Sequence, residues 1–179
     1  MNLHTHISRL ASRSGLRKLL LPACILILLA ILAYSLLQKQ QAPNVTFTTL
    51  QGEIVQMNDL RGKMVLVNFW ATTCTGCIAE MPKLIETYKQ YHNQGFEIVA
   101  VAMSYDPPSH VLNYAEKKAL PFPVSLDIQG DIASRFDNVQ LTPTTFVIDQ
   151  QGRIVRHVVG IIDFTALHSL LDKQLARPS

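Results

Sequence analysis

Residues 65–82 constrain the fold of this chain more than any other stretch, because they join a strand to a helix through a pair of cysteines. Their sequence is VLVNFWATTCTGCIAEMP. The apolar, β-branched run at the start predicts a strand. The threonines at 72–73 are favoured N-cap residues, so we expect a helix to begin there with Cys74 and Cys77 in its first turn.

The predicted position of the two cysteines indicates redox chemistry. Unpaired N–H groups and the helix dipole favour a thiolate at a helix N-terminus. Such sites lower a cysteine pKa from about 8.5 to roughly 3.5–7.5. Two intervening residues in helical geometry also bring the sulfurs close enough to form a disulfide. We expect Cys74, at the exposed end, to be the attacking thiol and Cys77, one turn further in, to be the resolving thiol.

Two other roles for the Cys-x-x-Cys pair fit the sequence poorly. A zinc site needs further cysteines or histidines at matching spacing, and the chain has no second cluster. A purely structural disulfide across two residues closes almost no loop and would stabilise the fold little. We therefore expect no metal site. Four histidines show no metal-binding spacing: His92, His110, His157 and His168.

Composition and charge divide the chain into an appendage and one domain. Of the 179 residues, 48% are hydrophobic and 16% charged, which suits a single domain of roughly 140 residues with a proper core. The net charge is +3, but the first 41 residues contain five basic and no acidic side chains. The remainder has 11 basic against 13 acidic side chains, so nothing in its charge indicates nucleic-acid binding.

An uncharged segment near the N-terminus has the length of a membrane span. As a helix, residues 19–37 would extend roughly 28 Å, close to a bilayer core of about 30 Å. Four basic residues precede the segment and Lys39 alone follows it, which places the N-terminus in the cytoplasm. We expect a cytoplasmic tail over 1–18, a transmembrane anchor over 19–37, a linker over 38–44 and an exported domain over 45–179.

Two alternatives for this segment remain open, and both also export the domain. Ala30 and Ala33 offer small residues for signal-peptide cleavage, although no clear cleavage motif ends the segment. A lipoprotein site at Cys24 fits less well, because this cysteine lies near the start of the apolar run. We expect Cys24 to be a small apolar residue without a redox role.

Strands alternating with helices predict a three-layer α/β sandwich. Its N-terminus should be a β-hairpin over 45–50 and 54–57. The helix after Cys74 should run to about His92, with a kink at Pro82. We expect the other strands over 64–70, 96–103, 124–126, 144–149 and 152–159, and the other helices over 109–119, 130–136 and 164–175.

The motifs N-F-W-A, C-x-x-C and E-M-P, with a Thr-Pro pair downstream, resemble those of a known family. It comprises the membrane-anchored, thioredoxin-like thiol-disulfide oxidoreductases of the bacterial envelope, the TlpA/ResA type of the redoxin superfamily. The resemblance extends from about Phe47 to the C-terminus. It implies a thioredoxin-like α/β/α sandwich with an N-terminal β-hairpin extension, and the activity of a disulfide reductase.

The resemblance also implies roles for residues around the cysteines. Glu80 would relay protons to the pair, and a partly buried carboxyl with a raised pKa could do so. Pro143 would be a cis proline facing the cysteines. The substrate would be contacted by Trp70, Thr75, Gly76 and Thr142. The alternatives are a solvated Glu80, a trans Pro143 that starts a strand, and simple core packing of the aromatic side chains.

Partners and location are implied by the resemblance as well. We expect protein disulfides as substrates, for example those of apocytochrome c, and a membrane thiol relay of the DsbD/CcdA type as electron donor. The protein would be a monomer without a cofactor other than its disulfide. It would be a single-pass protein of the bacterial inner membrane with its catalytic domain in the periplasm.

Two rival functions fit the motif less well. A peroxiredoxin-type peroxidase needs Pro-x-x-x-Thr-x-x-Cys, but Ala71 stands where its threonine would be. Metal delivery in related folds uses Cys-x-x-x-Cys with a histidine, and the spacing here is one residue short. Departures from the family, including Asn68 where cytosolic thioredoxins have a buried aspartate, leave the redox potential open.

Overall fold

The computed structural model describes Pro22, residues 25–30 and residues 40–176. The predicted cytoplasmic tail over 1–18 and most of the predicted anchor over 19–37 lie outside these residues, although 25–30 are helical. Among the described residues, no helix is both long and apolar enough to cross a bilayer. The chain divides into two units, Met1–Lys39 and Gln40–Ser179, and the second contains the redox motif.

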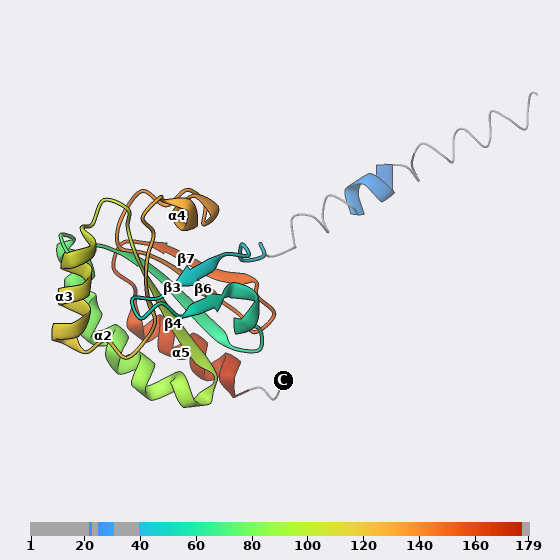
Figure 1. The fold of residues 1–179 in the computed structure, drawn as a ribbon. Coiled ribbons are helices and arrows are strands. Elements are labelled where there is room, and N and C mark those ends of the chain that lie inside the picture. The colour runs from blue at the N-terminus through green and yellow to red at the C-terminus, as the bar shows by residue number, and fades with distance from the viewer. Residues whose placement is uncertain (1–21, 23–24, 31–39, 177–179) are drawn as a thin grey trace, which may run out of the picture. The chain divides into compact units, whose positions relative to one another are not determined.

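A five-stranded mixed sheet forms the centre of the second unit (Figure 1), with the strand order β5-β4-β3-β6-β7. The parallel strands are β3, β4 and β5, and β6 and β7 run antiparallel to their neighbours. The predicted strands are confirmed with small shifts at their ends: β3 (Met64–Trp70), β4 (Phe96–Ala102), β5 (Val124–Leu126), β6 (Thr144–Ile148) and β7 (Ile154–Val159).

Helices and a hairpin cover the two faces of this sheet (Figure 1). Three long helices pack on one face: α2 (Thr75–Tyr91), α3 (Pro108–Lys118) and α5 (Phe164–Leu175). Shorter elements pack on the other: α4 (Asp131–Arg135), the 3-10 turn η1 (Met57–Leu60), and the antiparallel hairpin of β1 (Thr46–Thr48) and β2 (Ile54–Gln56). A second 3-10 turn, η2 (His92–Gln94), follows α2. The molecule therefore has the predicted three layers, with the hairpin in the thinner outer layer.

The central strand β3 is buried on both faces along its whole length. Leu66 and Trp70 pack in the core under α2 and α5, whereas Val67 and Phe69 pack in the core under α4 and the hairpin. Alternate side chains of a strand point to opposite faces. Asn68 must therefore face α2, and it is the one polar side chain within β3.

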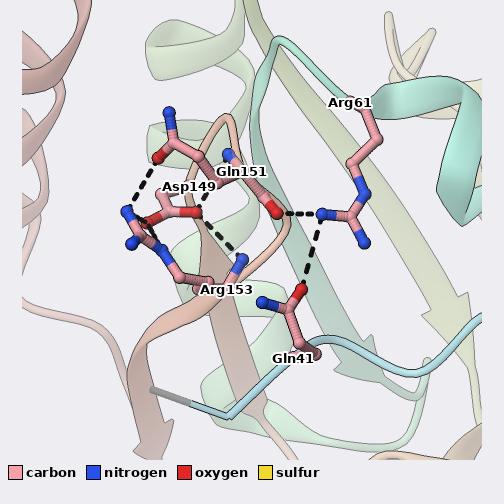
Figure 2. A network of polar contacts seen from close by, with 5 residues as sticks. All are labelled: Gln41, Arg61, Asp149, Gln151 and Arg153. Carbon is pink, nitrogen blue, oxygen red and sulfur yellow. Dashed lines mark hydrogen bonds and ion pairs between the residues drawn. The ribbon is translucent and has the colours of Figure 1, made fainter. Parts of the chain in front are cut away.

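A polar network at the far end of the sheet fixes the start of this unit (Figure 2). Arg61 donates hydrogen bonds to the Gln41 side chain and the Gln151 carbonyl, and Arg153 is paired with Asp149 at 2.8 Å. The Ala42 N–H also donates to the Gly152 carbonyl in the β6–β7 loop, and the Gln40 carbonyl accepts the N–H of Ile154 at the start of β7. Because β6 runs antiparallel to β3, this loop lies at the end of the sheet opposite the cysteines. Part of the expected 38–44 linker is thus bound to the domain.

Candidate redox-active site

The turn between β3 and α2 places Cys74 at the N-cap of the helix. Its backbone is extended, and its sulfur accepts a hydrogen bond from the backbone N–H of Cys77 at 3.2 Å. The predicted capping by the threonines at 72–73 is therefore wrong, because the hydroxyl and N–H of Thr72 bond to Asp106 instead. Cys77 lies in the first turn of α2 as predicted, whereas Cys74 caps the helix one residue before that turn.

The two cysteines form the predicted disulfide and differ in accessibility. Cys74 and Cys77 are covalently linked, with their Cα atoms 5.3 Å apart. Cys74 is half-buried, whereas Cys77 is 0% exposed. An external thiol or disulfide can therefore reach only the first sulfur. This asymmetry suits a nucleophile and an internal resolving thiol.

Glu80 lies one helical turn beyond Cys77 and is only 2% exposed. Burial raises the pKa of this carboxyl above its usual value, and hydrogen bonds from Asn68 and the Ile162 N–H partly offset the rise. The donor distances are 2.9 Å from Asn68 Nδ2 and 3.3 Å from the Ile162 nitrogen. The alternative of a solvated, helix-face glutamate is therefore wrong, and a raised pKa is what a proton acceptor near neutral pH requires.

The sequence does not show which residues form hydrogen bonds with Glu80. Asn68 Nδ2 also donates to Thr145 Oγ1 at 3.0 Å, so one amide links β3, β6 and α2. In the sequence, Asn68 stands out only as a departure from cytosolic thioredoxins, and nothing marks Thr145 or Ile162 as its neighbours. The available clue was a polar residue at an inward position of an otherwise apolar strand.

The Thr142–Pro143 peptide bond is cis, as the resemblance implied. Pro143 lies against the redox turn, since a Cβ added to Gly76 would be 3.4 Å from Pro143 Cδ and 3.5 Å from Ile161 Cγ1. The Thr142 hydroxyl is 3.1 Å from the Tyr105 hydroxyl. The structure thus brings Pro143, Thr142 and Gly76 together beside the cysteines, and exposed Thr75 adjoins them. Their contacts with substrate stay predictions.

Trp70 does not line the surface of the site. Its side chain is fully buried, and its ring packs on that of Tyr114 with centroids 5.3 Å apart. The expectation that Trp70 contacts substrate is therefore corrected, because β3 is covered on both faces up to its last residue. Trp70 instead packs in the same core cluster as Cys77, beneath the redox turn. Phe69 packs against Phe136 in the opposite core, as the alternative of core packing proposed.

Large apolar side chains are exposed around the disulfide. Tyr105, Leu141 and Ile161 are each more than half exposed. Tyr105 contacts Thr142, Leu141 precedes it in the chain, and Ile161 lies beside Gly76. Exposed apolar side chains that gather in one place indicate an interaction surface. We call these three residues the apolar rim.

This arrangement defines a site for dithiol–disulfide exchange. An accessible sulfur lies at a helix N-terminus, a buried partner sulfur is bonded to it, and a buried carboxyl with a raised pKa lies one turn further on. Among residues 25–30 and 40–176, no group of three or more His, Cys, Asp and Glu side chains could hold a metal ion. The bonded cysteine pair and the neighbouring carboxyl can together transfer an electron pair between sulfurs.

The comparisons with known proteins identify the family. The model of the AhpC/TSA family matches residues 39–157, and the chain belongs to this family. The thiol-disulfide oxidoreductase ResA of Bacillus subtilis (strain 168) is 34% identical over 138 residues, 77% of this chain and 76% of the relative. The ResA of Geobacillus kaustophilus (strain HTA426) is 36% identical over 149 residues, 77% of this chain and 84% of the relative.

Solved structures agree with this assignment. A thioredoxin-like protein from Neisseria meningitidis has a TM-score of 0.72 and 35% identity, covering 79% of this chain and 94% of its own. A thiol:disulfide interchange protein of the thioredoxin family from Chlorobium tepidum has a TM-score of 0.70 and 26% identity, covering 77% and 97%. The fold is therefore thioredoxin-like, and the protein is a thiol-disulfide oxidoreductase that acts through its Cys-x-x-Cys pair.

Proposed function

We propose that this oxidoreductase works as a reductase of protein disulfides. The supporting observation is the charge of the groups next to the redox turn: buried Glu80 lies one helical turn beyond Cys77, and buried Asp106 binds Thr72, two residues before Cys74. No lysine, arginine or histidine occurs between residues 64 and 82. Carboxyl groups oppose the thiolate that the helix start favours, and this stretch supplies no cation to offset them, so the dithiol form gains less stabilisation than it would beside a basic residue. A dithiol that is not stabilised gives up its electrons readily, which is the property of a reductase.

The proposed cycle starts from the reduced protein and transfers two electrons to the substrate. The Cys74 thiolate attacks a substrate disulfide, forming a mixed disulfide and releasing the first substrate sulfur as a thiolate, which takes up a proton. Cys77 loses its proton and attacks the Cys74 sulfur, which releases the second substrate sulfur. The protein ends as the Cys74–Cys77 disulfide, and the substrate ends as a dithiol.

Glu80 is proposed to accept the proton of Cys77 in the second step. Cys77 is fully buried, so bulk water cannot readily take this proton. Residues three apart on a helix are neighbours, which places the Glu80 carboxyl on the same side of α2 as Cys77. Because its pKa is raised, the Glu80 carboxylate binds a proton more tightly than a solvated carboxylate does. Its proton affinity is therefore closer to that of a thiolate, which favours proton transfer from Cys77.

The setting of the enzyme is also a proposal. We infer an extracytoplasmic domain held by an anchor over 19–37, acting as a monomer without a cofactor beyond its disulfide. The uncharged segment and the basic residues before it support this topology. Electrons would come through a membrane thiol relay of the DsbD/CcdA type, and apocytochrome c is a candidate client. Both partners rest on the family resemblance.

A paired assay tests the direction of electron flow. The full-length protein, kept reduced by a limiting dithiol, should accelerate reduction of a protein disulfide such as those of insulin. The oxidised protein should be a poor oxidant of a reduced, unfolded protein under the same conditions. Faster oxidation of the unfolded protein than reduction of insulin would overturn the reductase proposal, while leaving the exchange activity intact.

Replacing Ile161 in the apolar rim by serine should weaken the reaction with protein substrates selectively. Ile161 is 60% exposed beside the redox turn, so a protein substrate would bury much of it. Loss of that contact should lower kcat/KM for insulin about tenfold. The rate with a small aromatic disulfide should stay unchanged, because a small reagent buries little of the rim.

Ile54→Ser is the matched control for this experiment. Ile54 is 68% exposed but lies on the N-terminal hairpin, outside the apolar rim. It should leave kcat/KM for insulin at the level of the unmodified protein. If both serine variants lose activity equally, or if Ile161→Ser slows the small disulfide as well, the rim does not bind the protein substrate.

A further inference from the structure

One loop contacts two segments next to the redox pair: the segment just before Cys74 and the segment that contains the cis proline. It connects β4 to α3, and two adjacent residues in it make the contacts. The Tyr105 hydroxyl lies 3.1 Å from Thr142 Oγ1, beside Pro143. Asp106 Oδ2 accepts the backbone N–H of Thr72 at 2.6 Å, and Asp106 Oδ1 accepts the Thr72 hydroxyl at 2.6 Å. Thr72 stands two residues before Cys74.

Asp106 does not have the role that its position in the sequence suggests. An aspartate just before a helix ordinarily caps that helix. Here the N-cap of α3 is Pro107, which makes no side-chain capping bond, and the Asp106 carboxyl points to Thr72 instead. Asp106 is only 4% exposed, and burial of a carboxylate is costly unless hydrogen bonds compensate it. Hydrogen bonds to a carboxylate are characteristically short, and both of these are 2.6 Å.

We propose that Asp106 is a positioning residue for thiol-disulfide exchange, and that it acts through Thr72. The bidentate contact fixes the N–H and side chain of Thr72, and thereby the turn that the Cys74 N–H closes on the Ala71 carbonyl at 3.1 Å. That turn sets the direction of the Cys74 sulfur toward the backbone N–H of Cys77. The contact thus keeps the attacking sulfur where the helix start stabilises its thiolate.

The reduced protein depends on this contact more than the oxidised protein does. In the oxidised form the disulfide itself holds Cys74 against α2. Reduction breaks that covalent link, and the Asp106–Thr72 contact then remains to order the segment before Cys74. Loss of the contact should therefore destabilise the reduced form selectively. Positioning of the Cys74 sulfur serves the exchange step itself, so it is needed for either direction of electron flow.

Thr72→Val in the full-length protein tests the proposal, because it removes one bond to Asp106 and leaves the carboxyl in place. Alkylation of Cys74 by iodoacetamide at neutral pH should slow about tenfold. The pH at which alkylation reaches half its maximal rate should rise. In the reaction of the protein disulfide with two glutathiones, which yields the protein dithiol and glutathione disulfide, the equilibrium constant should fall about tenfold, or about 30 mV. Thr72→Ser, which retains the hydroxyl, should restore all three values.

Asp106→Ala distinguishes the positioning effect of Asp106 on Cys74 from the effect of its negative charge on the Cys74 thiolate. Loss of a nearby negative charge alone would favour the Cys74 thiolate and speed alkylation, whereas loss of positioning slows it. We expect slower alkylation. Thr73→Val, the same change one residue along at an exposed position, should behave as the unmodified protein. The proposal is overturned if Thr72→Val leaves the alkylation rate and the equilibrium constant unchanged, or if Thr73→Val loses as much as Thr72→Val. It is also overturned if Thr72→Val lowers the Tm but changes neither the pH profile of alkylation nor the equilibrium constant.

Discussion

Cys74→Ser is expected to reduce disulfide exchange to the uncatalysed background, a loss of roughly 10³-fold or more. The reason is that Cys74 has the only accessible sulfur of the pair, since Cys77 is fully buried and cannot be reached by a protein substrate. A serine hydroxyl is not ionised at neutral pH and forms no bond with the substrate sulfur. The measurement is the rate of insulin reduction by the full-length protein, with and without the substitution.

Two cysteine variants complete this experiment. Cys77→Ser should keep the attack but lack the resolving step, so a mixed disulfide between Cys74 and the substrate should accumulate and be visible by mass spectrometry. Cys24→Ser should leave the rate unchanged, because the sequence assigns Cys24 no redox role. Substantial activity in Cys74→Ser would contradict the assignment, as would an adduct on any cysteine other than Cys74.

Glu80→Gln should have the second-largest effect on the reaction, and the effect should depend on pH. Glutamine cannot accept the proton of Cys77, so the resolving step should slow by about 10²-fold. In the unmodified protein this step should accelerate as pH rises through the raised pKa of Glu80, because only the ionised carboxyl accepts a proton. In the Glu80→Gln variant, the rate of the resolving step should not fall at acidic pH in this way; the variant should lack this acid limb of the pH–rate profile. Stopped-flow kinetics of mixed-disulfide decay would show both differences.

The same substitution should change stability in a direction fixed by the sign of the pKa shift. Burial raises the pKa of Glu80, so the folded protein binds this proton more tightly than the unfolded chain does. The resulting stability is fully present below the usual carboxyl pKa and is lost as pH rises through the folded pKa. Glu80→Gln, which stays neutral, should therefore be the more stable form at neutral pH, and the difference should shrink on acidification.

The hydrogen bonds around position 80 can adapt to the variant. Asn68 can turn its amide toward a glutamine, because its Oδ1 has no hydrogen-bond partner among the described residues. Glu86→Gln is the control, since it makes the same chemical change at an exposed position of α2. It should alter neither the pH profile nor the unfolding temperature. A Glu80→Gln variant with an unchanged acid limb would show that another group takes the proton.

Local pattern was enough to predict most of the fold. The strand over 64–70 and the helix that follows the cysteines were predicted from hydrophobic periodicity and agree with β3 and α2. Periodicity succeeds here because β3 is buried on both faces and α2 on one. The cis geometry at Pro143 had no such local signal and was anticipated only through the family resemblance.

The errors arose where a distant residue decides the role of a local one. Thr72 has the chemistry of an N-cap, but Asp106, 34 residues further along, engages both its N–H and its hydroxyl. Cys74 then takes the cap position. The burial of Glu80 likewise depends on Asn68 and on the backbone of Ile162, which is 82 residues away. A single sequence shows helical spacing, but it does not show which strand or loop packs against a given helix face.

The reduction potential of the Cys74–Cys77 pair tests the central claim most directly. The full-length protein would be equilibrated with glutathione or dithiothreitol buffers, and the fraction of dithiol measured by alkylation and mass spectrometry. We expect one two-electron transition at about −270 mV, the range of reductases. A value near about −120 mV would contradict a reductase, and failure of the pair to titrate at all would contradict sulfur exchange as its function.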